Sequence, residues 1–156
     1  MDVSLTNAFP AVTAQNKRSD ACGRRSPARA ATIRVVTGDA LRDLCLSHQG
    51  SEETFPFGFE TSVFKVAGKM FALSRLEGQP LSVSLKCEPQ LAEQLRAAHP
   101  CITAGYHLNK RHWNTVVLDG SLPEQIVADM IEDSYDLIVS RLSRARQRAL
   151  LWRGAE

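Results

Sequence analysis

The strongest constraint on the fold of this chain is a pair of segments in which apolar and polar residues alternate. The first is VFKVAGKMFAL at residues 63–73, with a glycine near its centre, and the second is LSVSLKC at residues 81–87. A period of two places successive side chains on opposite faces of a strand. We therefore expect a sheet with one apolar face and one polar, lysine-bearing face.

The first segment predicts a hairpin. We expect Gly68 and Lys69 to form a two-residue type II′ loop, which leaves Lys65 on the polar face. The apolar face of this hairpin is then expected to hold Phe64, Val66, Phe71 and Leu73. In the second segment the residues expected to point inward are Leu81, Val83, Leu85 and Cys87. Those expected to point outward are Ser82, Ser84 and Lys86.

Helix signals stand on both sides of these strands. Thr37 is suited to cap a helix that runs to about His48, and Pro89 suits the first turn of a second helix that must end before Pro100. Ser121 and Glu124 have the spacing of a capping box, and apolar residues keep a helical period from there to about Leu142. The arginines expected at the end of this third helix are Arg141, Arg144, Arg146 and Arg148.

Two further strands are expected at residues 102–108 and 113–118, connected through residues 109–112. The predicted order is one helix, three or four strands, a helix, two strands and a helix. Hairpin-linked strands and few crossovers favour an α+β fold, with an antiparallel sheet packed on one face by helices.

The chain has the length of one domain, and its ends differ in composition from its middle. Residues 1–36 carry six basic and two acidic residues and no sustained apolar period, so we expect a disordered basic N-terminal extension. An organellar transit peptide would also suit it, but we favour a start codon placed too far upstream over a functional basic arm. Residues 37–150 are expected to form a single domain, and residues 151–156 a tail.

Composition excludes several classes of protein. No apolar run approaches the ~18 residues of a membrane span, so we expect a protein without a membrane partner. The four cysteines are Cys22, Cys45, Cys87 and Cys101. Their wide spacing predicts reduced thiols in the cytoplasm and no metal site. Neither a cofactor motif nor a known catalytic motif such as G-x-S-x-G or H-E-x-x-H is present, so we expect no cofactor and no enzymatic activity.

The stretch GYHLNKRHWNT at residues 105–115 concentrates polar and aromatic side chains. It predicts a cationic hairpin tip of Asn109, Lys110, Arg111 and His112. Phosphate contacts need lysine and arginine on projecting elements, and the lysines expected to assist are Lys65, Lys69 and Lys86. The same region could instead hold a small anionic ligand at Tyr106, His107 and Arg111, with Trp113 nearby. Tyr106 and Trp113 also suit packing at the core or its rim.

Four motifs make the chain similar to a known family. They are FPFG.ET.VFKVAGKMFAL, LKCEP.LAEQLR, GYHLNKRHWNT with the VVLDG that follows it, and SYDLIVSRL. Over about residues 37–142 the chain resembles the MmcQ/YjbR family of small bacterial proteins. The resemblance implies an α+β fold similar to the CyaY/frataxin domains and DNA binding through a double-wing arrangement of hairpins. Iron binding is not carried over, because the first helix offers only Asp39 and Asp43.

The sequence thus leads to one main functional hypothesis and two alternatives. The main hypothesis is a weak, largely non-specific DNA-binding protein that uses the cationic hairpin tips. The first alternative is a binding module, or less plausibly an enzyme with His107 or His112 as general base, for a small anionic ligand. The second is a protein-interaction module that docks through the polar sheet face or the terminal helix.

Overall fold

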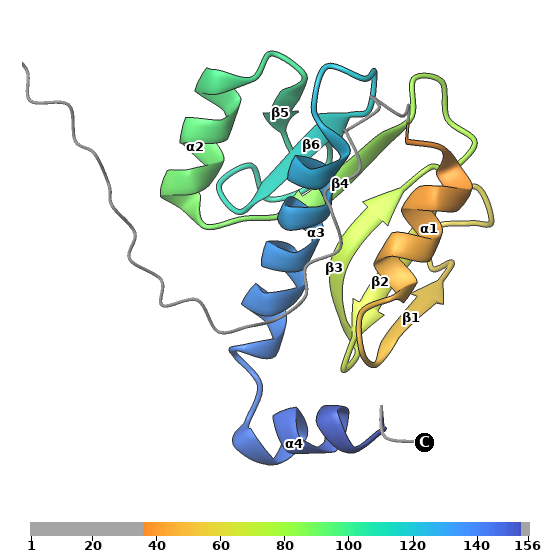
Figure 1. Ribbon diagram of the computed structural model, residues 1–156, viewed down its shortest axis with the longest axis vertical. Helices are drawn as coiled ribbons and strands as arrows, with labels where there is room; N and C mark the ends of the chain where they lie inside the picture. Colours follow the sequence, from red (N-terminus) through yellow and green to blue (C-terminus); the bar gives the residue numbers. More distant parts are fainter. Residues whose placement is uncertain (1–35, 154–156) are drawn as a thin grey trace, which may run out of the picture.

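The fold is α+β, with a six-stranded antiparallel sheet in the order β1-β2-β3-β4-β6-β5 (Figure 1). The computed structural model describes residues 36–153. Its helices are α1 (Gly38–Leu46), α2 (Pro89–Ala98), α3 (Glu124–Val139) and α4 (Arg144–Arg153). Its strands are β1 (Ser51–Thr54), β2 (Ser62–Val66), β3 (Lys69–Ser74), β4 (Ser82–Lys86), β5 (Ile102–Ala104) and β6 (Trp113–Val117). The expected basic extension lies almost entirely outside the described residues.

Three helices cover one face of the sheet, which we call the inner face (Figure 1). α3 packs on β3 and β4, α1 packs on β1, and α2 packs on β5 and β6. The apolar core lies between them, and the alternation predicted for β4 is confirmed, since Val83 and Leu85 are buried in this core. The opposite, outer face therefore carries the alternate residues, which include Ser82, Ser84 and Lys86.

The β2–β3 turn differs from the prediction by one residue. Ala67 and Gly68 occupy the loop with φ of +50° and +76°, and Val66 pairs with Lys69. Positive φ at both loop positions is the type I′ geometry, whose twist matches that of the flanking strands. The expected Gly68–Lys69 type II′ loop is therefore wrong.

A β-bulge in β3 also changes which residues face the core. Phe64 pairs with Ala72 and Lys65 pairs with Met70, so Phe71 is the extra residue. Phe71 and Ala72 are both fully buried. Since the alternation is shifted by one, Leu73 lies on the outer face instead of the expected inner face.

A buried serine of α3 holds this bulge in place. The Ser134 hydroxyl donates to the Phe71 carbonyl oxygen at 2.5 Å and accepts from the Lys86 backbone N–H at 2.8 Å. Ser134 is fully buried. The bulge leaves a backbone carbonyl outside the strand ladder, and this side chain satisfies it.

The ends of the helices confirm part of the sequence prediction. Thr37 caps α1, because its Oγ1 accepts from the Ala40 N–H at 3.2 Å. The capping box expected at Ser121 and Glu124 is wrong, since α3 begins after Pro123 without a side-chain cap. The Ser121 N–H instead donates to Asp119 Oδ1 in the preceding turn.

The third helix also ends earlier than expected. α3 ends at Val139, and after a short break α4 begins at Arg144 and continues to Arg153, beyond the boundary expected at residue 150. The arginines expected at a helix end therefore start a new helix. Gln49 Nε2 donates to the Leu151 carbonyl oxygen of α4 at 3.1 Å, which ties α4 to the loop before β1.

The described cysteines carry free thiols. Cys45 and Cys87 are buried. Burial raises the pKa of the Cys45 thiol to about 12, and the nearby Glu53 carboxylate acts in the same direction. A thiol with so high a pKa is a poor nucleophile at neutral pH. Within residues 36–153, no helix is both long and apolar enough to cross a bilayer.

The β2–β3 turn predicts a stabilising substitution. Ala67 holds φ of +50°, which strains any residue with a Cβ, so Ala67→Gly should raise the free energy of unfolding by about 0.5 to 1 kcal/mol. Urea denaturation measures this change. The matched control is Ala97→Gly, at an exposed position of α2, which should lower the free energy of unfolding by up to about 1 kcal/mol. Equal effects of the two substitutions would contradict the turn geometry.

The serine bridge predicts a destabilising substitution. Ser134→Ala leaves the Phe71 carbonyl and the Lys86 N–H without their buried partner and should cost about 1 to 3 kcal/mol in urea denaturation. The control is Ser140→Ala at the exposed end of α3, where a change within about 0.5 kcal/mol is expected. A neutral Ser134→Ala would show that the bridge contributes little.

Candidate functional site

The predicted cationic tip belongs to a long loop rather than a tight hairpin. β5 ends at Ala104, and residues 105–112 form the connection to β6. The strand expected at 102–108 is therefore too long. His107 has φ of +55°, in the left-handed region, which is incompatible with an extended strand.

Gly105 turns the loop over the outer face. Its N–H donates to the Trp113 carbonyl oxygen at 2.8 Å, and a Cβ on it would lie 2.7 Å from the Trp113 Cβ. Trp113 is only 8% exposed and does not belong to the main core cluster. Trp113 and Lys86 are paired neighbours on the outer face, so the loop buries the indole there. A ring so well covered offers little surface to a ligand and supports the loop instead.

The tip itself is a turn stabilised by its own asparagine. Asn109 Oδ1 accepts from the Arg111 N–H at 3.0 Å, and the Asn109 carbonyl oxygen accepts from the His112 N–H at 3.0 Å. Lys110 and Arg111 stand exposed in the middle of this turn. Asn109 therefore orients the two cations.

One residue at the tip was not predicted from the sequence. Arg96, near the end of α2, donates from Nη1 to the Lys110 carbonyl oxygen at 3.2 Å and from Nε to the Ala92 carbonyl oxygen at 3.1 Å. It anchors the tip to α2 and adds a further positive charge. Nothing in the sequence spacing links positions 96 and 110, because the contact depends on how α2 packs against β6.

The sheet topology brings the predicted cations to one end of the strands, which we call the cationic edge. In the antiparallel order, the β2–β3 turn, the end of β4 and the loop before β6 all lie at the same end of the strands. Lys69 lies beside the turn and Lys65 just before it, Lys86 at the end of β4, and Lys110 in the loop.

The pKa of Lys86 is lowered, in part because other cations are near. It is lowered first by partial burial of the ammonium group, and then by the positive charges of Arg141 and Lys69. Arg141 also lies 3.7 Å from a Glu88 carboxylate, with both side chains half exposed. An exposed ion pair of this length neutralises Arg141 only in part.

The outer face contains a concavity of about 630 Å³, which we call the outer-face trench. One wall is formed by Tyr106, His107 and Leu108 of the loop, and the other includes Phe57 of the β1–β2 loop. The floor residues include Leu73, Ser82, Ser84 and Thr115. The predicted ligand residues Tyr106 and His107 thus line a real cavity, while Arg111 is not among its lining residues.

The aromatic rings of the trench walls are open to solvent. Tyr106 is 75% exposed and Phe57 is 68% exposed. The rings of Tyr106 and His107 lie 4.0 Å apart. On the floor, the hydroxyls of Ser84 and Thr115 are hydrogen-bonded at 2.9 Å, and Thr115 Oγ1 accepts from the Tyr106 N–H at 3.3 Å. This last bond fixes the base of the aromatic wall to the sheet.

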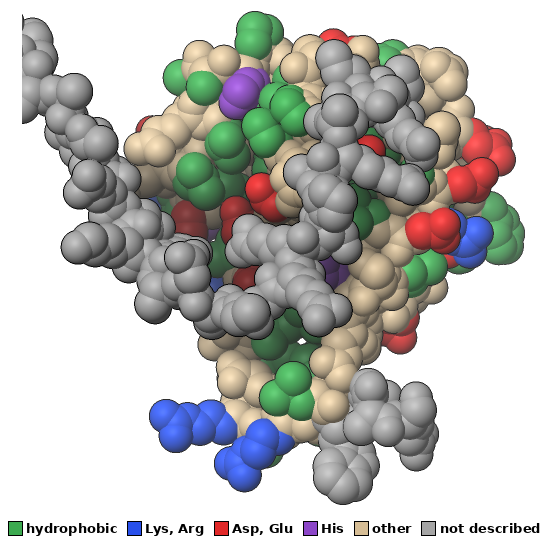
Figure 2. Space-filling view, in the orientation of Figure 1, with side chains coloured by type: hydrophobic (Ala, Val, Ile, Leu, Met, Phe, Trp, Pro, Cys, Tyr) green, Lys and Arg blue, Asp and Glu red, His purple; other side chains and the backbone are tan. Residues whose placement is uncertain are grey.

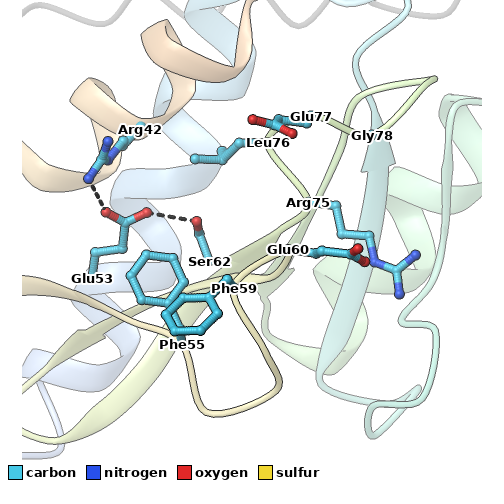
Figure 3. A pocket seen from close by; sticks show the side chains of 10 residues that line it. All are labelled: Arg42, Glu53, Phe55, Phe59, Glu60, Ser62, Arg75, Leu76, Glu77 and Gly78. Atoms are coloured by element: carbon cyan, nitrogen blue, oxygen red, sulfur yellow. Dashed lines mark hydrogen bonds and ion pairs between the residues drawn. The ribbon is translucent and has the colours of Figure 1, made fainter.

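A second cavity lies beside the first and was also missed by the sequence analysis. Figure 3 shows Phe55 and Phe59 close together on one side of it, with Glu53 next to them. Glu53 accepts from Ser62 Oγ at 2.7 Å and pairs with Arg42 Nη2 at 2.6 Å. Both carboxylate oxygens are occupied, so Glu53 is suited to a structural role. Arg75 lines both cavities.

The helix side of the molecule has a different charge character. Figure 2 shows acidic side chains spread over this side, whereas lysine and arginine gather at the lower end, where α4 lies in Figure 1. α3 contains acidic but no basic residues: Glu124, Asp129, Glu132, Asp133 and Asp136. Partial burial raises the pKa of Asp133, and the negative charges of Asp129 and Asp136 add to the effect. An anionic partner is therefore repelled from α3.

Within the described residues, no group of three or more His, Cys, Asp and Glu side chains is placed to hold a metal ion.

The close packing at Gly105 predicts a local displacement. Gly105→Ala should push the loop away from Trp113 and lower the free energy of unfolding by about 1 to 3 kcal/mol. The sequence holds two tryptophans, so the emission of Trp113 is measured in a Trp152→Phe background. A red shift is expected because the indole becomes wetter. Unchanged emission and stability would show that the loop tolerates a Cβ here.

Known proteins are similar to this chain over most of its length. Residues 46–137 match the YjbR family. The YjbR protein of Escherichia coli K12 is 35% identical over 117 residues, which cover 74% of this chain and 98% of the relative. The YbdF protein of Escherichia coli O157:H7 is 40% identical over 111 residues, covering 70% of this chain and 90% of the relative.

Two solved structures share the fold. The crystal structure of the Deinococcus radiodurans protein DR2400, of the domain family DUF419, has a TM-score of 0.71 at 42% identity. It covers 78% of this chain and 91% of its own. A Pseudomonas syringae protein has a TM-score of 0.55 at 28% identity and covers 64% of this chain and 96% of its own.

Proposed function

The chain belongs to the YjbR family, and on that premise we propose that it is a weak, largely non-specific DNA-binding protein whose cationic edge contacts the phosphates. The observation that carries this proposal is the shared edge of the β2–β3 turn, the end of β4 and the 105–112 loop. Three separate parts of the sequence thereby present lysine and arginine at one end of the strands. Phosphate contacts of this kind position a protein on DNA without reading its sequence.

The division of roles follows from the exposure of the side chains. Lys110 and Arg111 are exposed at the turn and would contact phosphates first, and Lys69 lies at the same end of the strands. Asn109 orients these cations through its hydrogen bond to Arg111. His112 is half-buried and adjoins the tip, where it can reach a phosphate or a base edge.

The expected binding is weak because the positive charge is modest. Residues 61–115 contain seven basic and three acidic residues. Neutralising about three phosphates gives a slope of only about −2.7 in a plot of log affinity against log salt. The acidic α3 supports an orientation in which DNA approaches the opposite side.

A second candidate function is supported by the outer-face trench. Its cavity of about 630 Å³ has the size of a small-molecule site, and Arg75 lies in its wall. Tyr106 and His107 would contact a small anionic ligand there, as the sequence suggested. We retain binding rather than catalysis as the proposal, because the His107 ring packs against the tyrosine ring and no Asp, Glu, Lys or Cys of the described residues lines the trench.

The DNA-binding proposal predicts the effect of a double substitution. Lys110→Ala with Arg111→Ala should weaken binding of a fluorescein-labelled 20-base-pair duplex by tenfold or more at about 50 mM salt, because about two phosphate contacts are lost. Fluorescence anisotropy measures the affinity, and the salt slope should become about 1.8 units shallower.

The matched control removes the same charge from α4. Arg144→Ala with Arg148→Ala changes two exposed arginines on another element and should have the smaller effect. Equal losses in the two double variants would mean that net charge alone attracts DNA. Absence of any duplex binding by the unaltered chain at about 50 mM salt would refute the proposal.

A further inference from the structure

The outer-face trench has aromatic rings on opposite walls, supplied by loops far apart in the sequence. Phe57 comes from the β1–β2 loop and Tyr106 from the loop before β6. Both are more than two-thirds exposed, although a tyrosine and a phenylalanine of a folded domain usually bury most of their area. Two solvent-exposed rings that face a shared cavity are suited to stacking on flat ligands.

The floor of the trench suits the edge of a nucleobase. Leu73, brought to the outer face by the β-bulge, gives it an apolar part. Ser84 and Thr115 share one hydrogen bond and Thr115 also accepts from the Tyr106 N–H, which leaves one hydroxyl hydrogen and the remaining lone pairs for a ligand. Such a floor accepts donors and acceptors in several arrangements, so it tolerates different bases.

One cation lines the trench, and a second lies in line with its floor residues. Arg75 lies in its wall. Ser82, Ser84 and Lys86 alternate along β4 on the outer face, so Lys86 continues the row of floor residues toward the cationic edge. The phosphates of a bound strand could therefore pass from the trench toward Lys86 and on to Lys110, which lies in the loop at the same end of the strands.

An intact, stacked DNA duplex offers these rings no free base face. In a duplex, each base face is covered by the neighbouring base pairs, so an aromatic side chain on a groove wall meets only base edges. An unpaired base has free faces and can stack on Tyr or Phe without regard to its identity.

We propose that the outer-face trench binds unpaired bases of single-stranded DNA, which stack on Tyr106 and Phe57 while the phosphates lie along the cationic edge. This inference rests on the proposed function, because it uses the same cations for the backbone. It adds a preference for single strands over duplex at equal salt.

The test compares both forms of DNA in the same assay. The full chain is titrated against a fluorescein-labelled 15-nucleotide oligo(dT) and against the labelled duplex. Tyr106→Ala should weaken oligo(dT) binding by about fivefold to a hundredfold, the range for loss of one stacked base, and Tyr106→Phe should restore it. Duplex binding should change less than twofold.

Phe59→Ala is the matched control. Phe59 lies on the same loop as Phe57 and is 92% exposed, but it lines the second cavity and not the trench. Phe59→Ala should leave oligo(dT) affinity unchanged, whereas Phe57→Ala should lower it. Thermal unfolding of each variant verifies that the fold is retained.

Three results would overturn the inference. If Tyr106→Ala leaves oligo(dT) binding intact, or weakens binding of oligo(dT) and duplex equally, the stacking role is removed. If thymidine monophosphate binds as tightly as oligo(dT) and loses affinity in Tyr106→Ala, the trench holds a free nucleotide. In each case the Lys110→Ala, Arg111→Ala variant tested on duplex still decides the proposed function separately.

Discussion

The hydroxyl of Ser134 connects the helix layer to the part of the sheet that shapes the outer face. It bonds the Phe71 carbonyl in the bulge of β3 and the Lys86 N–H at the end of β4. The bulge turns Phe71 and Ala72 together toward the core and moves Leu73 to the floor of the outer-face trench. One buried polar contact thus supports both the packing of α3 and the shape of the opposite face.

The same arrangement separates the charges of the molecule. α3 contributes acidic side chains to one side, while the ends of β2, β4 and the loop before β6 contribute cations to one edge. The overall charge of +2 conceals this separation. A protein of low net charge can therefore favour one direction of approach for an anion, since local fields rather than net charge govern the encounter.

The architecture could be largely predicted from the sequence because it follows from local periodicity. The alternation in residues 81–87, the Thr37 cap and the Pro89 helix start are confirmed. The type of the β2–β3 turn and the bulge were missed, because both depend on strand twist and on partners in α3.

The candidate site could be predicted only in part. The cations of the tip were visible in one short stretch, and topology puts them at the same sheet end as Lys69 and Lys86. The trench was not predicted, because its lining residues come from loops and strands far apart in the sequence. In addition, a strand was expected where His107 takes a left-handed conformation. Arg96 was missed because its contact with the tip depends on tertiary packing.

Both edge strands of the sheet are short, with four residues in β1 and three in β5. Two adjacent glutamates, Glu52 and Glu53, stand in β1. Short edge strands, one of them charged, give a neighbouring molecule little backbone to pair with, which protects against strand-by-strand aggregation. Exposed aromatic rings can therefore persist on this protein without promoting growth of the sheet from one copy to the next.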